Sequence, residues 1–527
     1  MLAKRLRWPV DSAHIVHQDR KILYKIHDTL FPIEPTTRKL HALLRHVPRT
    51  GSIFVFGVGA GVLVDRILAR GTLDRVIVWD RDPWLVRLFL ERRDYSSHLR
   101  SGRLVLKLGC TLISEREELR KIPMIGLPFF VGLYGREYHL LRVHKTKGII
   151  FLCAGELFVK DIAQTLQRNG YTIYTWEVER LSHDEVVYAA MQSRPVAIVS
   201  INYRYGLSEV AASCGVPLYV WEIDPSMDKV RPVSFSVEKT YIYTWNRENI
   251  AKFQHAGFAN VKHLPLATNP ERCKTIVLSD EDRSRYGSTL AFVGASLRRQ
   301  AIHYQSSFLD TYRKFCGKDG TQKLQCILNE QAKDYSQYRI PELILEYFPG
   351  LSVAFQGAHI DLAALVSEVA AHHKRLHRVR LLADRGLRVW GDFGWRQAES
   401  QYRGQADHIK EVVRIYNGAL INIDINRIYQ PNIVTMRVFD VLASGGFLLA
   451  EHSSDLETLF AVDEEIVSYR TEAELIQKVD HYLSHPEERE AIAARGQAKV
   501  LRDHTIQSRV RWMLEQISDR RGQDGAL

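Results

Sequence analysis

The chain has 527 residues, which suggests about three or four domains rather than one hydrophobic core. Hydrophobic residues make up 46% and charged residues 25%, a composition that excludes an intrinsically disordered chain. The net charge of +11 suits nucleic acid, an anionic membrane surface or a phosphorylated substrate. The basic residues are spread along the chain, without aromatic residues interleaved in an RNA-binding motif. We therefore expect a phosphate-bearing small substrate and no nucleic-acid partner.

No apolar run reaches the roughly 18 residues that a membrane helix needs, although peripheral membrane association stays compatible with the composition. The basic start of the chain is not followed by the apolar segment of a signal peptide, so we expect a cytoplasmic protein. The cysteines are scattered without a CxxC pair, which argues against a metal site or a disulfide framework. They are Cys110, Cys153, Cys214, Cys273, Cys316 and Cys326.

Short apolar runs alternate with amphipathic stretches along the chain, a pattern typical of parallel α/β architecture. A first series of strands predicts a Rossmann-like domain over 1–145, with strands at 52–56, 75–79 and 104–108. A second series predicts an open parallel sheet over 146–285, with a helix over 159–169 and strands at 148–153, 171–175, 196–201, 217–221, 241–244 and 261–265.

A third series occupies 286–503, and a helical tail over 504–527 completes the chain. Its strands are expected at 288–293, 387–390, 418–423 and 446–450, and a long helical stretch is expected over about 297–383. The predicted fold is therefore three Rossmann-like domains in succession, followed by a helical C-terminus.

A glycine cluster in the first domain predicts a nucleotide site. Gly57, Gly59 and Gly61 follow a strand and open a helix, where glycine lets backbone N–H groups approach a ligand closely. Asp80 ends the next strand, where an acid can accept hydrogen bonds from a ribose. The alternative is a tight strand-to-helix turn that binds nothing. The cluster resembles that of S-adenosylmethionine methyltransferases. With the Trp79–Asp82 stretch, it also resembles the N-terminal part of the motility accessory factor family.

Two polar groups in the middle domain predict a catalytic crevice. Asn202 follows one strand and Asp224 follows another, and ligands of open α/β sheets bind outside the carboxyl ends of the strands. Asp224 is our first candidate for a general base that accepts a hydroxyl proton. It could equally cap a turn before Pro225. His183 and Glu156 are weaker candidates.

The stretch from 420 to 451 combines a buried strand, a polar loop and a helix expected over 433–444, which Gly445 and Gly446 terminate. Arg437 and Asp440 are three residues apart and share a face of this helix. The helix N-terminus, with Thr435 and Arg437, suits a diphosphate, and Asp440 could bind a ribose. The alternative is an ordinary buried helix packed on a sheet.

This stretch resembles the C-terminal domain of the spore-maturation CgeB-like glycosyltransferases, and the likeness extends over about 147–515. It rests on Arg437-Val-Phe-Asp440, on Gly445-Gly446 and on the terminal acid Glu451. The resemblance implies a GT-B enzyme that binds a nucleotide-sugar between two Rossmann-like domains. It also implies that neither a metal nor another cofactor is required, because the protein stabilises the leaving diphosphate.

The sequence departs from the two glutamates that many retaining GT-B enzymes carry, because Asn432 and Asp440 stand at those positions. Asp440 can still bind a ribose, whereas Asn432 cannot act as an acid or base. By the same resemblance, Gly391 would line the pocket for the base, with Trp390 or Phe393 available for stacking. This segment could also be only a turn.

The sequence thus predicts a glycosyltransferase that moves a sugar from a nucleotide-sugar to an acceptor hydroxyl. The acceptor would be a glycan or a protein such as flagellin. A methyltransferase, or a fusion of the two activities, is the first alternative, because of the Gly57–Gly61 cluster. A non-catalytic scaffold for glycan assembly is the second.

Overall fold

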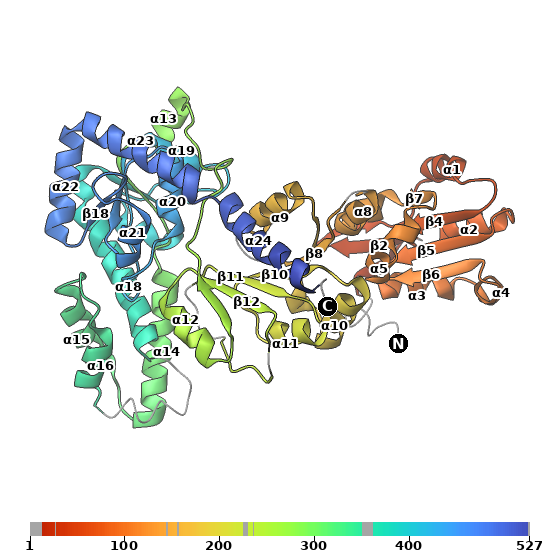
Figure 1. Cartoon of the computed structure of the whole chain (residues 1–527), viewed down its shortest axis with the longest axis horizontal. Helices are drawn as coiled ribbons and strands as arrows, with labels where there is room; N and C mark the ends of the chain where they lie inside the picture. Colours follow the sequence, from red (N-terminus) through yellow and green to blue (C-terminus); the bar gives the residue numbers. More distant parts are fainter. Residues whose placement is uncertain are drawn as a thin grey trace. The chain divides into compact units, whose positions relative to one another are not determined.

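The structure is a computed structural model, and its described residues form two compact units, 1–264 and 265–527 (Figure 1). Each unit is considered by itself. The described residues are 13–19, 21–26, 28–143, 146–154, 158–224, 230–235, 237–349 and 362–524.

The first unit begins with a three-stranded antiparallel sheet that the sequence analysis did not anticipate. Its strands are β1 (Ile15–Gln18), β2 (Lys21–Ile26) and β3 (Thr29–Pro32), in that order. They are short, and their charged and exposed residues hide the alternation by which a half-buried strand is recognised.

A four-stranded parallel sheet follows, with strand order β6-β5-β4-β7. Its strands are β4 (Ser52–Phe56), β5 (Arg75–Asp80), β6 (Leu104–Leu108) and β7 (Met124–Gly126). The first three match the predicted strands, and β7 is additional. The helices around this sheet are α1 (Thr37–Arg45), α2 (Val62–Ala69), α3 (Pro83–Glu91), α4 (Ser96–Arg100), α5 (Thr111–Ser114), α6 (Arg116–Leu119), α7 (Pro128–Leu133) and α8 (Gly135–Arg142).

The rest of the first unit is built on a six-stranded parallel sheet with the order β13-β12-β11-β10-β8-β9. The strands are β8 (Ile149–Cys153), β9 (Thr172–Trp176), β10 (Ala197–Ile201), β11 (Leu218–Glu222), β12 (Thr240–Thr244) and β13 (Asn260–His263). All six predicted strands are therefore confirmed to within two residues at each end. The α-helices between them are α9 (Val159–Arg168), α10 (His183–Ser193), α11 (Leu207–Ser213) and α12 (Glu248–His255).

The second unit contains a five-stranded parallel sheet with the order β15-β14-β16-β17-β18. The strands are β14 (Ser288–Val293), β15 (Leu387–Trp390), β16 (Ala419–Ile423), β17 (Leu448–Glu451) and β18 (Val467–Tyr469). The α-helices are α13 (Asp280–Tyr286), α14 (Arg298–Cys316), α15 (Thr321–Ala332), α16 (Ile340–Tyr347), α18 (Leu362–Leu381), α19 (Val412–Gly418), α20 (Met436–Ala443), α21 (Ser454–Leu459), α22 (Glu472–Ser484), α23 (Pro486–Asp503) and α24 (Ile506–Asp524).

The predicted α/β class with several parallel sheets and a helical C-terminus is confirmed. The strands are near-continuous apolar runs because helices cover the faces of a parallel sheet, so both faces are buried. In β4, for example, Ile53 to Phe56 are all 0% exposed. The predicted domain boundaries at 145, 285 and 503 stay predictions.

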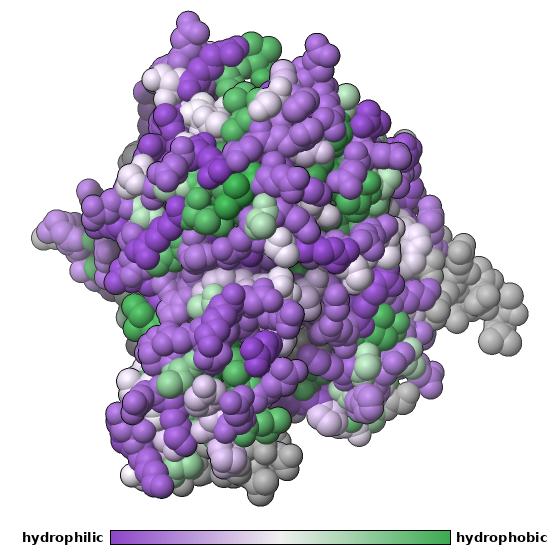
Figure 2. All heavy atoms as spheres, turned by 90° about the vertical axis from the view of Figure 1, so that its left-hand side faces the viewer, coloured by the Kyte–Doolittle hydropathy of each residue, from purple (hydrophilic) through white to green (hydrophobic). Residues whose placement is uncertain are grey.

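The visible face in Figure 2 is mainly hydrophilic, with hydrophobic residues scattered in small groups. Among the helices that the structure describes, none combines the length and apolar character needed to cross a membrane.

Candidate functional site

The strand order of the second unit reverses direction between β14 and β16. The chain passes from β14 to β15 on one side, and the next strand, β16, lies on the other side of β14. At such a switch point the loops after the two strands diverge, and open α/β sheets bind ligands there, outside the carboxyl ends of the strands.

Arg437 connects the carboxyl ends of these two strands. Its Nε donates to the carbonyl oxygen of Val293, the last residue of β14, at 2.7 Å. Its Nη1 forms an ion pair with the carboxylate of Asp424, just after β16. The Asp424 side chain is only 1% exposed and the Arg437 side chain 13%, so little water screens this pair. A positioned guanidinium, its charge balanced by Asp424, therefore lies at the switch point of the sheet.

A glycine is required beside the Arg437 guanidinium. A Cβ atom on Gly294 would lie 2.8 Å from Arg437 Nη2. The guanidinium carbon also lies 4.7 Å from the ring centroid of Phe292, which positions the cation over an aromatic face. The loop after β14 is thus shaped to admit this arginine.

The predicted helix begins at Met436 rather than Ile433, so Thr435 is its N-cap residue. The Thr435 hydroxyl donates to Asp424 Oδ1 at 3.2 Å and does not cap the helix itself. The first N–H groups of a helix have no intrahelical partner and carry a partial positive charge. At its other end, Gly445 has a φ of +77° and, with Gly446, ends the helix as predicted.

Asp440 contacts a different segment from Arg437. Its carboxylate is 1% exposed and accepts a 2.6 Å hydrogen bond from the hydroxyl of Thr268. Burial raises the pKa of this carboxyl group, and the hydrogen bond from Thr268 partly offsets the effect. Arg437 and Asp440 thus have different partners, although they are three residues apart.

Gly391 holds the loops after β14 and β15 together. A Cβ on Gly391 would lie 2.1 Å from the carbonyl oxygen of Gly294, so no other residue fits. The neighbouring Asp392 accepts hydrogen bonds from the backbone N–H and the hydroxyl of Ser296, at 3.0 and 2.5 Å. The structure therefore places Gly391 at the same sheet edge as Arg437, within a turn that protein groups stabilise.

A cavity of about 440 Å³ lies at the carboxyl ends of β16, β17 and β18. Its lining includes a buried ion pair between Lys374 Nζ and Glu451 Oε1 at 2.7 Å, with side chains 4% and 9% exposed. Glu451 Oε2 also accepts the N–H of Asn426 at 2.8 Å. Asn432 lines the same cavity and accepts a hydrogen bond from Ser454 Oγ at 3.1 Å.

One buried acceptor in this cavity has no partner in the part of the chain that the structure describes. Asn426 is 3% exposed, and its side-chain Oδ1 makes no hydrogen bond to the residues that the structure describes. A buried polar atom without a partner costs free energy, so the site favours a ligand that donates a hydrogen bond there.

Two buried cations of α18 support this edge of the sheet. Arg375 donates to the carbonyl oxygens of Ala295 at 2.7 Å and Ile425 at 3.3 Å, and so links the loops after β14 and β16. Burial lowers the pKa of Arg375 to about 9. Burial also lowers the pKa of Lys374, which the carboxylate of Glu451 partly offsets.

In the first unit, the two catalytic candidates of the middle sheet meet. Asn202 Nδ2 donates to Asp224 Oδ2 at 3.0 Å, and Asn202 Oδ1 accepts the N–H groups of Ile223 and Asp224. Asn202 follows β10 and has a φ of +60°, whereas Asp224 follows β11 and is exposed. The exposed carboxylate is thus oriented by a neighbouring amide. His183 is exposed near the start of α10, and Glu156 lies outside the described residues.

The glycine cluster after β4 packs against the protein's own side chains. Gly57, Gly59 and Gly61 all have positive φ angles, as the turn requires. A Cβ on Gly57 would lie 2.5 Å from Phe130, and a Cβ on Gly61 would lie 2.3 Å from Phe89. The glycines are therefore explained by internal packing, whether or not a ligand binds.

The polar groups of this turn are also used internally. Asp80 is fully buried and accepts hydrogen bonds from Val58 N, Asp82 N and Tyr134 Oη at 2.8 to 2.9 Å. Glu34 Oε1 accepts the N–H groups of Ala60 and Val62, at 2.5 and 3.5 Å. Burial raises the pKa of Asp80 to about 7 and that of Glu34 above its usual value. The protein's own carboxylates therefore already accept backbone N–H groups of this turn.

Three residues of the site were missed by the sequence analysis: Asp424, Lys374 and Asn426. Asp424 and Asn426 stand in the polar run after a predicted strand, where a charged residue directly after an apolar run is a usable signal. Lys374 belongs to His372-His373-Lys374-Arg375, a polar run within a helix that is otherwise rich in apolar residues. Its ion pair with Glu451, 77 positions away, cannot be recognised from the sequence.

Residues 351–515 match a family model described as glycosyl transferase-like. The matched range contains Asp424, Asn432, Arg437 and Glu451. The second unit therefore contains a glycosyl transferase-like domain. No curated protein sequence matches the chain.

Several solved structures are similar to this chain. HepE from Anabaena, in complex with UDP and glucose, is 12% identical, with a TM-score of 0.39 over 71% of this chain and 100% of that chain. Sucrose-phosphate synthase from Thermosynechococcus elongatus is 11% identical, with a TM-score of 0.40 over 72% and 100%. A glycosyltransferase from Rickettsia africae is 9% identical, with a TM-score of 0.37 over 90% and 99%. Similarities at this level assign neither a donor nor an acceptor.

Proposed function

We propose that this protein is a GT-B glycosyltransferase of the CgeB-like type, which transfers a sugar from a nucleotide-sugar to an acceptor hydroxyl. The proposal rests on the fixed cation Arg437 at the switch point of a sheet in a glycosyl transferase-like domain. A diphosphate is the part of a nucleotide-sugar that most needs such a charge.

Arg437 and the N-terminus of α20 would stabilise the leaving diphosphate. As the bond from the anomeric carbon to the diphosphate breaks, negative charge builds up on the departing oxygen. Donors that are already in place stabilise that charge without reorganisation. The Val293 carbonyl and the Asp424 carboxylate hold the Arg437 guanidinium in position before the donor arrives. In this proposal the protein supplies all the stabilising charge, so no metal or other cofactor is required.

The glycosyl ring of the donor would occupy the neighbouring cavity. Asn426 Oδ1 supplies a buried acceptor, and Asn432 supplies an exposed amide held by Ser454. A sugar hydroxyl that donates to Asn426 would satisfy the unpartnered oxygen. Asn432 would bind and orient the ring rather than transfer a proton.

Asp224 would act as the general base on the acceptor. The acceptor oxygen forms the new bond to the anomeric carbon and loses its proton to a carboxylate within hydrogen-bond reach. The hydrogen bond from Asn202 fixes the Asp224 carboxylate for this role. A glycan or a protein such as flagellin supplies the acceptor, in the cytoplasm.

The methyltransferase alternative finds less support, because Asp80 and Glu34 already accept the N–H groups of the Gly57–Gly61 turn. A cofactor would have to displace both carboxylates. A non-catalytic scaffold would differ from the enzyme only in turnover, so an assay of donor hydrolysis and sugar transfer distinguishes the two.

A thermal-shift panel tests the proposal, using UDP-, GDP-, ADP-, CMP- and dTDP-sugars together with S-adenosylmethionine. A ligand that binds only the native state raises the melting temperature by mass action. We expect one nucleotide class to stabilise the wild type and an Arg313→Ala control, which removes an exposed arginine at the end of α14. Arg437→Ala should abolish that shift.

Arg437→Ala leaves the buried Asp424 without its cation, so Asn432→Ala serves as a second variant at an exposed position. It should weaken the response to the sugar-nucleotide but not the response to the nucleoside diphosphate alone. A shift from S-adenosylmethionine alone would overturn the proposal. Donor binding without hydrolysis or transfer would identify the scaffold instead.

A further inference from the structure

The excess of positive charge is confined to the first domain, contrary to the even spread that the sequence analysis assumed. Residues 1–145 contain 26 Lys and Arg against 14 Asp and Glu, a net charge of +12. Residues 146–527 contain 46 against 47, a net charge of −1. The part of the chain that carries the proposed donor and acceptor sites is therefore neutral overall, so its substrates do not explain the basic first domain.

Part of this charge gathers at one edge of the four-stranded sheet. Parallel strands begin at the same edge, and here Ser52 of β4 pairs with Arg75 of β5, and Val76 with Leu104 of β6. Six arginines belong to this edge, because they lie at the starts of these strands or at the ends of the helices that lead to them. We call them the basic edge: Arg45, Arg49, Arg70, Arg75, Arg100 and Arg103.

Backbone contacts show that these segments adjoin one another. Arg75 N donates to the carbonyl of Gly51, two residues after Arg49, and Val76 N donates to the carbonyl of Arg103. Arg103 Nη2 donates to the carbonyl of Leu68, near the end of α2. Adjacent strands are about 4.8 Å apart, so the guanidinium groups of the basic edge lie within a few side-chain lengths of one another.

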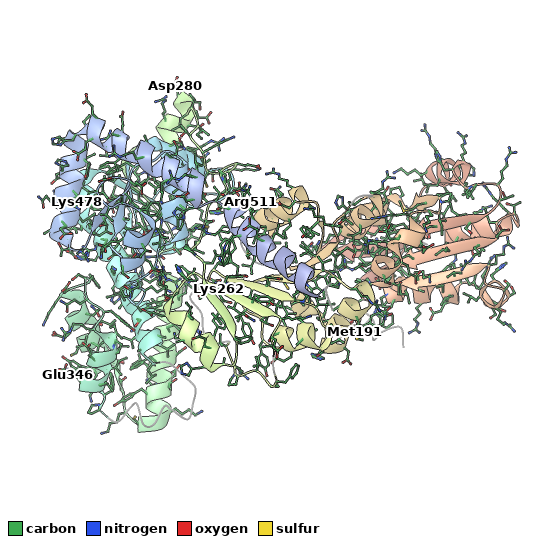
Figure 3. All side chains as sticks on the ribbon, in the orientation of Figure 1. Met191, Lys262, Asp280, Glu346, Lys478 and Arg511 are labelled. Carbon is green, nitrogen blue, oxygen red and sulfur yellow. The ribbon has the colours of Figure 1, made fainter. Side chains whose placement is uncertain are left out.

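These charges are available to a partner. Five of the six arginines are exposed and Arg103 is half-buried. None of the six forms an ion pair with any residue that the structure describes. Around α1, which Arg45 ends, long side chains with nitrogen tips extend outward (Figure 3). Among the described residues, no acidic side chain occurs from Pro35 to Val64, a segment that contains all of α1 and β4.

We propose that the basic edge binds the anionic surface of a phospholipid membrane. Six arginines against one exposed carboxylate at this edge, Asp74, match a surface that carries negative charge everywhere, without requiring defined partner positions. Leu99, next to Arg100 on α4, is 38% exposed and can contact the acyl boundary of the headgroup layer. The segments that carry the basic edge, 44–52, 68–76 and 98–104, contain no Phe, Tyr or Trp on which bases could stack, so nucleic acid fits less well.

Sedimentation of the full chain with vesicles tests this proposal. The vesicles are phosphatidylcholine alone, or phosphatidylcholine with an equal part of phosphatidylglycerol. We expect binding to the anionic vesicles only, and loss of binding as ionic strength rises from about 0.1 M to about 1 M and the Debye length shortens from about 10 Å to about 3 Å.

The decisive variant is the triple substitution Arg45→Gln, Arg49→Gln and Arg75→Gln. Each arginine near an anionic surface contributes about fivefold to binding, so the triple variant should bind about 100-fold more weakly. The matched control, Arg313→Gln, Lys318→Gln and Lys410→Gln, removes the same charge from exposed positions in the second unit. It should bind like the wild type. All variants should keep the wild-type melting temperature and their donor response.

Two results would overturn the proposal. Equal sedimentation of the wild type and the basic-edge variant would show that these arginines do not carry the interaction. Tighter binding to single-stranded RNA than to anionic vesicles, at equal phosphate concentration, would assign the basic edge to nucleic acid instead. Neither result would affect the proposed glycosyl transfer, which the donor panel tests separately.

Discussion

Two strand-to-helix connections of this protein use similar elements in different ways. After β4, the Gly57–Gly61 turn opens α2, and after β16, the segment that begins at Asp424 leads to α20. In the first connection the backbone N–H groups are bound by Asp80 and Glu34. In the second, the carboxylate of Asp424 holds a cation, Arg437, and a cavity lies alongside.

A glycine motif after a strand therefore indicates a backbone conformation and close packing, and does not by itself indicate a bound ligand. Gly57 and Gly61 are required because Phe130 and Phe89 pack against them. Whether the turn can bind a phosphate depends on which groups already accept its N–H donors. Asp80 and Glu34 lie 22 to 28 residues from those donors, so only the folded chain reveals their role.

The largest effect is expected from Gly61→Ala. The new Cβ would lie 2.3 Å from Phe89, and the φ of +92° is strained for alanine. Overpacking and strain together should destabilise the first unit by about 3 kcal/mol or more. Hydrogen exchange of β4 and β5 measures the loss. Gly71→Ala is the matched control, because Gly71 has a φ of +74° but open space around it, and it should cost about 1 kcal/mol. Equal losses would contradict the packing explanation.

A slightly smaller effect is expected from Arg437→Ala, which leaves a buried carboxylate unpaired. Removing one partner of a buried ion pair costs about 3 kcal/mol, measured here by urea unfolding of the second unit. The double variant Arg437→Met with Asp424→Asn should recover part of this stability, because no unpaired charge remains. It should not recover transfer activity, because the diphosphate has lost its cation. Recovery of both stability and transfer activity would show that the mechanism does not require Arg437.

The stability of the first connection should also depend on pH, because of Asp80. The pKa of Asp80 is raised by burial to about 7, so the folded state keeps a proton that the unfolded state has lost above about pH 4. The first unit should therefore lose stability as pH rises, by about 2 kcal/mol between pH 5 and pH 7, and then level off. Hydrogen exchange of β4 and β5, corrected for intrinsic rates, measures this. In Asp80→Asn the same interval should give a flatter profile, and an unchanged profile would exclude Asp80 as its source.

The smallest effect is expected from Ser454→Ala. Ser454 donates to Asn432 Oδ1 at 3.1 Å, so its loss should leave the amide of Asn432 less well oriented. One such hydrogen bond contributes about 0.5–1 kcal/mol, so the KM for the donor should rise about twofold to fivefold with little change in stability. Ser306→Ala removes a similar bond, to Asp310 on the exposed side of α14, and should leave the KM unchanged. A change in kcat alone would contradict an orienting role.

Much of the fold was predictable because strands that are buried on both faces of a parallel sheet are continuous apolar runs in the sequence. The strands of the three parallel sheets were found in this way, apart from the short β7 and β18. The antiparallel strands β1 to β3 were not, since their residues are partly exposed. In the candidate site, Arg437 and Gly445 were predicted from their places on a helix, which depend only on local sequence.

The sequence by itself determined the parallel α/β class, the polar strand ends and the excess of basic residues over residues 1–145. Tertiary structure alone decided that Asp440 meets Thr268, that Lys374 meets Glu451 and that Asp80 and Glu34 fill the glycine turn. The reason is physical. Periodicity and charge are properties of neighbouring residues, whereas a buried polar group takes whichever partner the packing of distant elements brings within hydrogen-bond distance.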